Sequence, residues 1–490
     1  MSALATPNPG TRLLIDGALR ESAGGARFEN VDPSTGEVIG TCADASAADM
    51  DAAIAAARRA FDETGWSTDA AFRKRCLTQL HDGLASELEN LRAILVAEAG
   101  VPVALTHWYQ LDPVLDDLLY WRDQIDRFPL ETELPVRNVM GRPTRRTIRR
   151  EPYGVVGAIT PWNVPLHLIN VKLGPALASG NTVVLKPPPD TPWTGATLAR
   201  IVAEKTEIPP GVVNVITSSD HAVGERLVAD RRVDLVSFTG STATGKRIMQ
   251  VGASNVKRIF LELGGKSAHI VLDDVDPAAI AGAFTAGCTH AGQGCSNLTR
   301  ILLPRSRYAE GLEAVVKAVE AVPYGDPRDP QKVMGPVIRK SQHERILGII
   351  ERGRRQARLA TGGRVPPGLE RGYFIEPTVF ADVPNESPLA QDEIFGPVLC
   401  VIPYEDDDDA VRIANDSRYG LSGAVTGADE ERAQRIARRL RTGTVSVNGG
   451  QYFCVDAPFG GYRESGLGRE NGAMGYEEYL ETKLIASPAV

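Results

Sequence analysis

Three polar side chains have the chemical types that acyl transfer at a carbonyl carbon requires. Cys295 lies in HAGQGCSNLTR, among small and polar residues that allow close approach of a substrate, so its thiol is a candidate nucleophile. Glu262 interrupts the apolar stretch of IFLELGGKSAHIVL, where burial raises a carboxyl pKa and favours a general base. Asn163 lies in the rigid turn TPWNVPLHLIN, where its amide can donate to a developing oxyanion.

Each of these side chains also has an ordinary structural interpretation. A lone cysteine is more often a small buried hydrophobic residue, and Cys288 is a second thiol only seven residues before Cys295. Glu262 can be a salt-bridged structural residue, and Asn163 can cap the helix predicted to follow it. Local sequence alone therefore leaves both interpretations open.

Two further segments are candidates for phosphate and nucleotide binding. SFTGSTATGKRI runs from an apolar strand through Gly240 and Gly245 into a predicted helix, so backbone amides there can face an anion. It lacks the G-x-G-x-x-G pattern, and a glycine at such a turn is more often a tight connection. Lys186 ends the predicted strand NTVVLK, at the edge where parallel sheets bind ligands, although a solvated strand end is the alternative.

Short apolar runs that alternate with helical segments position these residues. GVVGAIT, NTVVLK, GVVNVIT and DLVSFTG predict parallel strands with helices on both faces, typical of a doubly wound nucleotide-binding sheet. After Glu262 the runs AHIVL, TRILLP, GPVLCVIPY and GTVSVNGG predict a second α/β domain. Upstream, helical spacing predicts a helix in the segment that begins at Ala45 and a second helix from Ala71 to Gly100.

Composition narrows the classes of partner. The chain has 490 residues, 43% of them hydrophobic, and 54 basic against 62 acidic side chains give a net charge of −8. Without a Lys/Arg-rich block, this charge argues against binding to nucleic acid or an anionic membrane. No apolar run approaches the ~18 residues of a spanning helix, and the N-terminus lacks a signal-like pattern. Six widely spaced cysteines favour a reduced setting, so we expect a cytoplasmic protein.

The acidic run from Asp406 to Asp409 is the one segment that invites a metal interpretation. The helical sequence VRIAN follows it, and acidic residues in a first helical turn interact favourably with the helix dipole. We therefore predict a helix start and no metal site.

Five segments together resemble the aldehyde dehydrogenase superfamily, over nearly the whole chain and in the family's order. They are PWNVP, LELGGKS, GQGC, EIFGPV and PFGGYRESGLGRE, with SFTGS between the first two. One such match is weak, whereas five in order are very specific. The resemblance implies oxidation of an aldehyde, expected to be hydrophobic, to the carboxylic acid with reduction of NAD or NADP. The reaction would pass through a cysteine thiohemiacetal and a thioester.

The resemblance also implies residue roles. Cys295 would attack the aldehyde, Asn163 and the Cys295 backbone N–H would hold the oxyanion, and Glu262 would deprotonate the water that hydrolyses the thioester. The implied cofactor contacts are Lys186, Thr160, Trp162, Gly240, Ser241, Gly264, Glu393 and Phe395. The implied lining of the substrate tunnel is Val164, Leu168, Val171, Phe453 and Phe459.

The implied architecture has three parts. Residues 1–132 and 150–261 would form a Rossmann-like NAD(P)-binding domain, and residues 262–461 an α/β catalytic domain. Residues 133–149 and 462–490 would form a small β oligomerisation element. The segment PTRRTIRREPYG within and after this element is expected to be a strand exposed in the monomer. We therefore expect a homodimer or a homotetramer.

Two departures from the family pattern carry their own expectations. Thr289, His290 and Ala291 stand where the family often has Phe and Asn, and Gly294 directly precedes Cys295, so local geometry is expected to differ. Pro189 in KPPPD replaces a glutamate of many NAD-preferring members, which predicts use of NADP as well as NAD.

Three alternatives to this oxidation stay open on sequence grounds. They are a thiol-dependent ester or thioester hydrolase on the same fold, a coenzyme-A-acylating variant and a catalytically silent relative. The presence of Lys186, Glu393 and Phe395 favours the dehydrogenase over the hydrolase, and Glu262 argues against the acylating variant.

Overall fold

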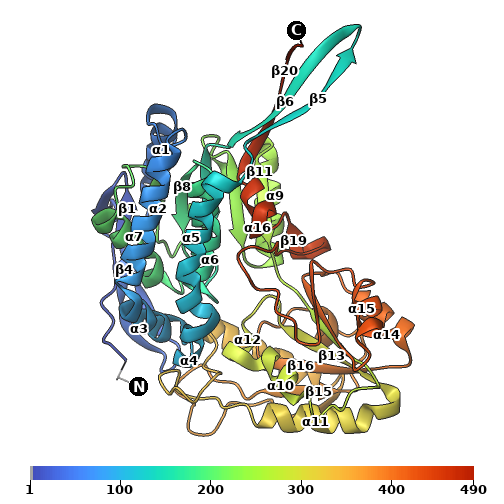
Figure 1. Cartoon of the computed structure of the whole chain (residues 1–490). Helices are drawn as coiled ribbons and strands as arrows, with labels where there is room; N and C mark the ends of the chain where they lie inside the picture. Colours follow the sequence, from blue (N-terminus) through green and yellow to red (C-terminus); the bar gives the residue numbers. More distant parts are fainter. Residues whose placement is uncertain (1–3, 490) are drawn as a thin grey trace.

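The computed structural model describes residues 4–489 and has two mainly parallel sheets, each covered by helices (Figure 1). The α/β class predicted from the alternating apolar runs is confirmed. Within the described residues, every helix is too short or too polar to cross a bilayer.

The first sheet has eight strands in the order β19-β11-β10-β7-β8-β9-β1-β2. The five strands from β11 to β9 are parallel, and β19 and β1 join them antiparallel at either side. The strands are β1 (Leu13–Ile15), β2 (Ala18–Arg20), β7 (Val155–Ile159), β8 (Thr182–Lys186), β9 (Val213–Val215), β10 (Leu235–Thr239), β11 (Arg258–Glu262) and β19 (Gly466–Leu467).

Helices cover both faces of this sheet because its strands are apolar on both sides. Val156 and Val183 pack into one core, whereas Val155 and Val184 pack into the other. On the first side lie α2 (Ala70–Ala85), α3 (Leu88–Ala99), α5 (Asp112–Arg127), α6 (Pro165–Ala178) and α7 (Pro192–Lys205). On the other side lie α1 (Ala47–Glu63), α8 (His221–Ala229) and α9 (Thr242–Gly252). The short turns α4 (Val103–Leu105) and η1 (Thr106–Gln110) precede α5, and η2 (Ala253–Asn255) follows α9.

The single helix expected from Ala71 to Gly100 is wrong, because α2 and α3 are separate helices. The Ser86 hydroxyl donates to the Gly83 carbonyl at 2.7 Å, a local bond that competes with helix continuation. Glu87 lies between the two helices, and its side chain forms ion pairs with Arg200 and Lys205. These partners come from α7, so the break is set by tertiary contacts.

The second sheet has seven strands in the order β14-β15-β16-β13-β12-β17-β18, all parallel except for the β14–β15 pair. The strands are β12 (Ser267–Val271), β13 (Leu298–Pro304), β14 (Arg358–Thr361), β15 (Thr378–Ala381), β16 (Val398–Tyr404), β17 (Ser422–Thr426) and β18 (Thr444–Val447). The accompanying helices are α10 (Ala281–Thr285), η3 (Ala286–Gly292), η4 (Arg305–Arg307), α11 (Tyr308–Glu320), α12 (Lys340–Gly353), α13 (Pro388–Gln391), α14 (Asp407–Asn415) and α15 (Glu430–Ala437).

The acidic run is the start of α14, as predicted. The Asp406 side chain accepts a hydrogen bond from the Asp409 N–H at 2.9 Å and caps the helix. Within residues 4–489, no cluster of His, Cys, Asp and Glu side chains is arranged to hold a metal ion.

A three-stranded antiparallel sheet of β5 (Glu131–Val139), β6 (Arg142–Pro152) and β20 (Leu480–Pro488) projects from the body (Figure 1). Most of its residues are exposed, and β6 lies in the middle. The strand predicted within PTRRTIRREPYG is part of β6. The structure differs from the expected span 462–490, since residues before Leu480 form η5 (Arg463–Ser465), β19 and α16 (Gly472–Glu477), and β19 joins the first sheet. A separate hairpin joins β3 (Arg27–Asp32) and β4 (Glu37–Ala43).

Candidate active site

Cys295 lies in the loop between η3 and β13 and is half-buried, whereas Cys288 is fully buried. The chain reaches this loop through His290, Ala291 and Gly292, whose φ angles of 50°, 54° and 71° all lie in the left-handed region. Two consecutive non-glycine residues in that region are strained, and such strain persists only where the surroundings enforce it. Of the two thiols, only that of Cys295 is open to a substrate.

Two glycines after Glu262 bring distant segments together at this loop. A Cβ atom on Gly264 would lie 2.1 Å from the Glu393 carboxylate, and one on Gly265 would lie 2.8 Å from the Cys295 carbonyl oxygen. The contact at Gly265 is with backbone and is too close for any side chain, whereas a side chain at Gly264 would displace the Glu393 carboxylate. The sequence LELGGKS therefore allows the loop of Cys295 and the segment of Glu393 to approach the end of β11.

Burial and the negative charge around Cys295 keep its thiol protonated. Burial raises the pKa of Cys295 far above its ordinary value, and the carboxylates of Glu262 and Glu393 raise it further. A thiol in such surroundings needs a base or a nearby cation before it becomes a thiolate.

Glu262 ends β11 and is 1% exposed. Burial, and next the nearby Glu470 carboxylate, raise the pKa of Glu262 well above its usual range. Glu470 forms a buried ion pair with Lys172 at 2.9 Å. Within residues 4–489 the Oε1 atom of Glu262 has no hydrogen-bond partner. A buried carboxyl group with a raised pKa and a free oxygen is suited to take a proton from water.

Asn163 precedes α6, and its side chain is turned away from the helix. The Asn163 Nδ2 atom donates to the Gln293 backbone carbonyl at 3.0 Å, and the Asn163 backbone carbonyl accepts from Gln110 Nε2 at 3.2 Å. The N-cap of α6 is Val164, so the alternative of Asn163 as the helix cap is wrong. The amide is thus fixed two residues before Cys295 and keeps a second N–H for another acceptor.

The carboxyl edge of the first sheet carries polar groups suited to a dinucleotide. Thr160 is 4% exposed, and its Oγ1 atom has no partner in the described chain. The Lys186 ammonium has only long contacts to the Pro187 and Ser218 carbonyls, at 3.5 and 3.4 Å. Burial lowers the pKa of Lys186 to about 8. The Thr160 hydroxyl and the Lys186 ammonium can therefore bind ribose hydroxyls or phosphate oxygens.

The strand-to-helix turn of SFTGS has the geometry of an anion site. Gly240 is at the end of β10, and Ser241 is the exposed N-cap of α9, where its side chain accepts from the Thr244 N–H at 3.2 Å. The N–H groups of this helix start carry partial positive charge. This turn, Thr160 and Lys186 all lie at the carboxyl ends of strands of the first sheet, so one dinucleotide could contact all three.

Glu393, Phe395 and Trp162 form the other side of the same region. The Trp162 and Phe395 rings meet edge to face at 5.3 Å, and Phe395 has a φ of 52°. Glu393 accepts from the Gly265 N–H at 3.1 Å, and burial raises the pKa of Glu393 to about 7. Gln342 fixes this segment by donating to the Phe395 carbonyl at 3.0 Å.

The expected tunnel residues lie on two separate segments. Val164, Leu168 and Val171 lie on one side of α6 or at its start, following Asn163 at helical spacing. The Phe453 and Phe459 rings stack at 5.1 Å on the loop after β18, where Phe453 is 52% exposed and Phe459 is 5% exposed.

Sequence reasoning missed three residues near these segments. Tyr452 lies beside Ser296 and is close enough to Cys295 for the two groups to interact electrostatically. Gln342 and Arg345 on α12 donate to the backbone of the segment that contains Glu393. No sequence motif marks them, because their role depends on the contact between remote segments.

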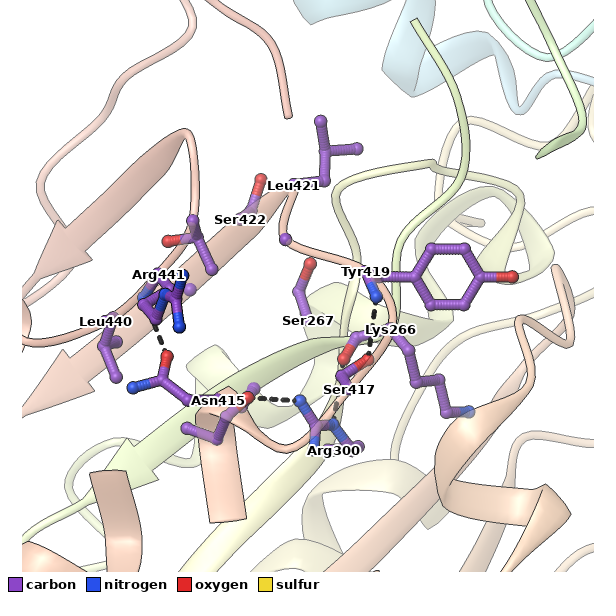
Figure 2. A pocket seen from close by; sticks show the side chains of 15 residues that line it. Lys266, Ser267, Arg300, Asn415, Ser417, Tyr419, Leu421, Ser422, Leu440 and Arg441 are labelled. Carbon is purple, nitrogen blue, oxygen red and sulfur yellow. Dashed lines mark hydrogen bonds between the residues drawn. The ribbon is translucent and has the colours of Figure 1, made fainter. Parts of the chain in front are cut away.

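Figure 2 shows a narrow pocket lined by β12, β13, β17 and the loop after α14. The Arg300 guanidinium fills its floor and donates to the Lys266, Ile413 and Ala414 carbonyls at 2.8 to 2.9 Å. None of the predicted site residues lines this pocket. Its hydrogen bonds hold strands and loop together, which is a structural role.

The fold and the site together combine a half-buried thiol with a sheet of the dinucleotide-binding type. The sequence profile described as "Aldehyde dehydrogenase family" matches residues 19–485. A curated relative, the 3-succinoylsemialdehyde-pyridine dehydrogenase of a Pseudomonas species, is 40% identical over 476 residues, covering 96% of this chain and 97% of the relative.

Solved structures agree over the whole length. An aldehyde dehydrogenase of Mycobacterium tuberculosis in complex with NAD+ has a TM-score of 0.93 and 41% identity, covering 99% of both chains. A mutant of aldehyde dehydrogenase C (AldC) of Pseudomonas syringae, in complex with NAD+ and octanal, has a TM-score of 0.93 and 38% identity, covering 99% of this chain and 98% of that one. This chain belongs to the aldehyde dehydrogenase family, and the predicted resemblance is confirmed.

Proposed function

We propose that this chain oxidises aldehydes to carboxylic acids with NAD or NADP as the electron acceptor, through a thioester on Cys295. The observation that carries the proposal is the convergence of a half-buried thiol, a fixed amide and a buried carboxyl group from three remote segments. The thiol is that of Cys295, the amide that of Asn163 and the carboxyl group that of Glu262.

In the first step, the Cys295 sulfur attacks the aldehyde carbon as its thiol proton is lost. The raised pKa of Cys295 requires a base, and Glu262 is the carboxylate that acts most strongly on this thiol. The oxyanion accepts hydrogen bonds from Asn163 Nδ2 and the Cys295 N–H. When bound, the oxidised nicotinamide supplies the acceptor for the hydride that leaves this carbon.

The second step is hydrolysis of the thioester left on Cys295. Once Glu262 has released the thiol proton to solvent, it takes a proton from water and the resulting hydroxide attacks the acyl carbon. The thiolate then leaves and recovers a proton from Glu262, which regenerates the free enzyme. Glu470 supports this role, because its charge adds to the effect of burial in raising the pKa of Glu262 above its ordinary value.

The cofactor would lie along the carboxyl edge of the first sheet. Lys186 and Thr160 would hold the adenosine half, and Ser241 with Gly240 a pyrophosphate oxygen. Glu393 would accept from the nicotinamide ribose, next to Gly264, with Phe395 and Trp162 packed beside it. The Thr160 Oγ1 atom, which has no partner in the described chain, and the long hydrogen bonds of Lys186 Nζ support this placement.

The substrate would enter between α6 and the loop after β18 that contains Phe453 and Phe459, here called the aromatic loop. Val164, Leu168 and Val171 would contact the chain next to the carbonyl group, and Phe453 and Phe459 would contact its outer part. These apolar side chains favour a hydrophobic aldehyde, and the AldC structure holds octanal. The exposed β5–β6–β20 sheet supports a homodimer or homotetramer, and six cysteines without a disulfide support a cytoplasmic location.

Cofactor reduction during aldehyde consumption tests this function. The purified chain is given octanal with NAD+ or NADP+, and the reduced cofactor is measured by absorbance while the acid is measured by chromatography. We expect one reduced cofactor for each acid formed. Hydrolysis of an ester without cofactor-dependent aldehyde oxidation would instead support the hydrolase alternative.

A further inference from the structure

Asp117 on α5 and His167 on α6 face each other without a hydrogen bond. Their Oδ2 and Nδ1 atoms are 3.8 Å apart, beyond hydrogen-bond distance. One turn away, Asn170 of α6 donates to the Val114 carbonyl of α5 at 3.2 Å, so the two helices are in close contact here. Both side chains are about one fifth exposed. The Asp117 carboxylate and the His167 ring therefore lie side by side without a hydrogen bond between them.

This pair lies on the proposed substrate side of α6. His167 follows Val164 by three residues and precedes Val171 by four, the spacing of one helical face. On α5, Tyr120 comes one turn after Asp117 and is close enough to Asp456 for the charge of Asp456 to act on the phenol group. Asp456 lies in the loop after β18 that also contains Phe453. The pair is therefore between Asn163 and the outer end of the proposed channel.

No positive charge in the described chain compensates Asp117. Among the ion pairs of residues 4–489, its single basic neighbour is His167. Burial lowers the pKa of His167, so this ring is neutral near pH 7, and within residues 4–489 its Nδ1 atom has no hydrogen-bond partner. Burial and the neighbouring Asp116 raise the pKa of Asp117 to about 7. A ligand with a positive charge would stabilise the carboxylate.

We propose that Asp117 and His167 form a polar subsite that selects aldehydes with a cationic nitrogen at the far end of a short apolar chain. This inference rests on the proposed function and specifies its substrate class. The apolar residues of α6 contact the chain, and the Asp117 carboxylate contacts the cationic end. The exposed Asp456 adds negative charge nearby, which favours the approach of cations.

The helix sets the length of the substrate. His167 is three residues beyond Val164, the N-cap next to Asn163, which corresponds to about 4.5 Å along the helix axis. An extended chain advances roughly 1.2 Å per bond, so about four bonds separate the carbonyl carbon from the cation. An aldehyde of four carbons with a terminal trimethylammonium group has nearly this length. Its neutral isostere has a tert-butyl group in place of the trimethylammonium group.

These two aldehydes isolate the effect of charge, because they have nearly the same size and shape. The ratio of their kcat/KM values is measured for the wild type, for Asp117→Asn and for the control Asp116→Asn. This ratio does not depend on the fraction of active enzyme, so partial misfolding of a variant does not distort it. We expect the wild type to prefer the cation about 10-fold or more, since 10-fold is a modest effect for a partly buried charge.

Asp117→Asn is expected to reduce this preference about 10-fold, whereas Asp116→Asn, whose side chain is 79% exposed, leaves it within about twofold. The inference is overturned if the wild type prefers the neutral aldehyde, or if Asp117→Asn leaves the ratio unchanged. If both aldehydes are oxidised equally, the subsite fails and the proposed function stands. If neither these aldehydes nor octanal reduces the cofactor, the proposed function itself fails.

Discussion

The Cys295 thiol is the residue on which the chemistry depends. We expect Cys295→Ala to abolish both aldehyde oxidation and any esterase activity, because both require an acyl group on sulfur. Cys288→Ala is the matched control, since Cys288 is fully buried and burial raises its pKa to about 12. Its turnover is expected to stay within about threefold of wild type. Substantial dehydrogenase turnover by Cys295→Ala, measured by cofactor reduction, would overturn the assignment.

The ionisation of Glu262 predicts the acid side of the pH profile. A general base works as the carboxylate, so kcat falls as the pH drops through the raised pKa of Glu262. Glu470→Gln removes the charge that raises this pKa and leaves Lys172 as a nearby cation. We therefore expect the acid limb of kcat to move to lower pH by about one unit.

The control for this prediction is Glu431→Gln, because the Glu431 side chain is 93% exposed. Breaking the Lys172–Glu470 pair costs about 3–5 kcal/mol, so the profile is recorded well below the melting temperature. An acid limb that stays in place or moves to higher pH would show that Glu470 does not control the base.

The catalytic candidates could be predicted at the residue scale, because each lies in a distinctive local sequence. Asp117 and His167 could not, because their approach depends on how α5 packs against α6. His167 does have a weak sequence signal, namely its helical spacing from Val164 in PLHLIN. The roles of Cys295, Glu262 and the cofactor residues stay predictions until they are measured.

At the scale of elements, the start of α12 approaches the turn after β8. Asp190 follows Pro189 in KPPPD and forms an ion pair with Arg339 at 2.6 Å. Arg339 is the N-cap of α12, so the pair joins the first sheet to a helix of the second. The neutralised Asp190 repels a ribose phosphate less, and Lys186 remains as a nearby cation.

We therefore expect kcat/KM with NADP to be within about 10-fold of that with NAD, a difference of roughly 1.4 kcal/mol. Arg339→Gln frees the charge of Asp190 and is expected to reduce the NADP value about threefold or more relative to NAD. The control is Lys340→Gln, whose side chain is 75% exposed. An NAD preference of several hundredfold in the wild type would contradict the prediction.

The sequence predicts some of these helices and strands correctly and not others. The β7, β8 and β10 strands coincide with predicted apolar runs, because continuous Val/Ile/Leu sequences have few other buried arrangements. The break between α2 and α3 was missed, since it depends on Arg200 and Lys205 of another helix.

For the whole molecule, the projecting sheet predicts self-association. Leu484 and Ile485 of β20 are 60% and 45% exposed, and β20 is an edge strand. Exposed apolar residues on an unpaired edge favour contact with a second chain. We expect the wild type to sediment as a dimer or tetramer at micromolar concentration, and Leu484→Asp to shift it towards monomer.

Thr482→Asp adds the same charge to an exposed polar position of the same strand and serves as the control. It is expected to weaken association less than Leu484→Asp does. A stable wild-type monomer would count against the predicted oligomer.

The central claim is that the acyl group is held on Cys295 and released by a water that Glu262 deprotonates. The most direct test mixes Glu262→Gln with octanal and oxidised cofactor, stops the reaction with acid and determines by mass spectrometry which residue is acylated. We predict an octanoyl group on Cys295, about one per subunit, after a rapid burst of reduced cofactor and before slow turnover. An unmodified Cys295 with wild-type steady-state turnover would contradict the claim.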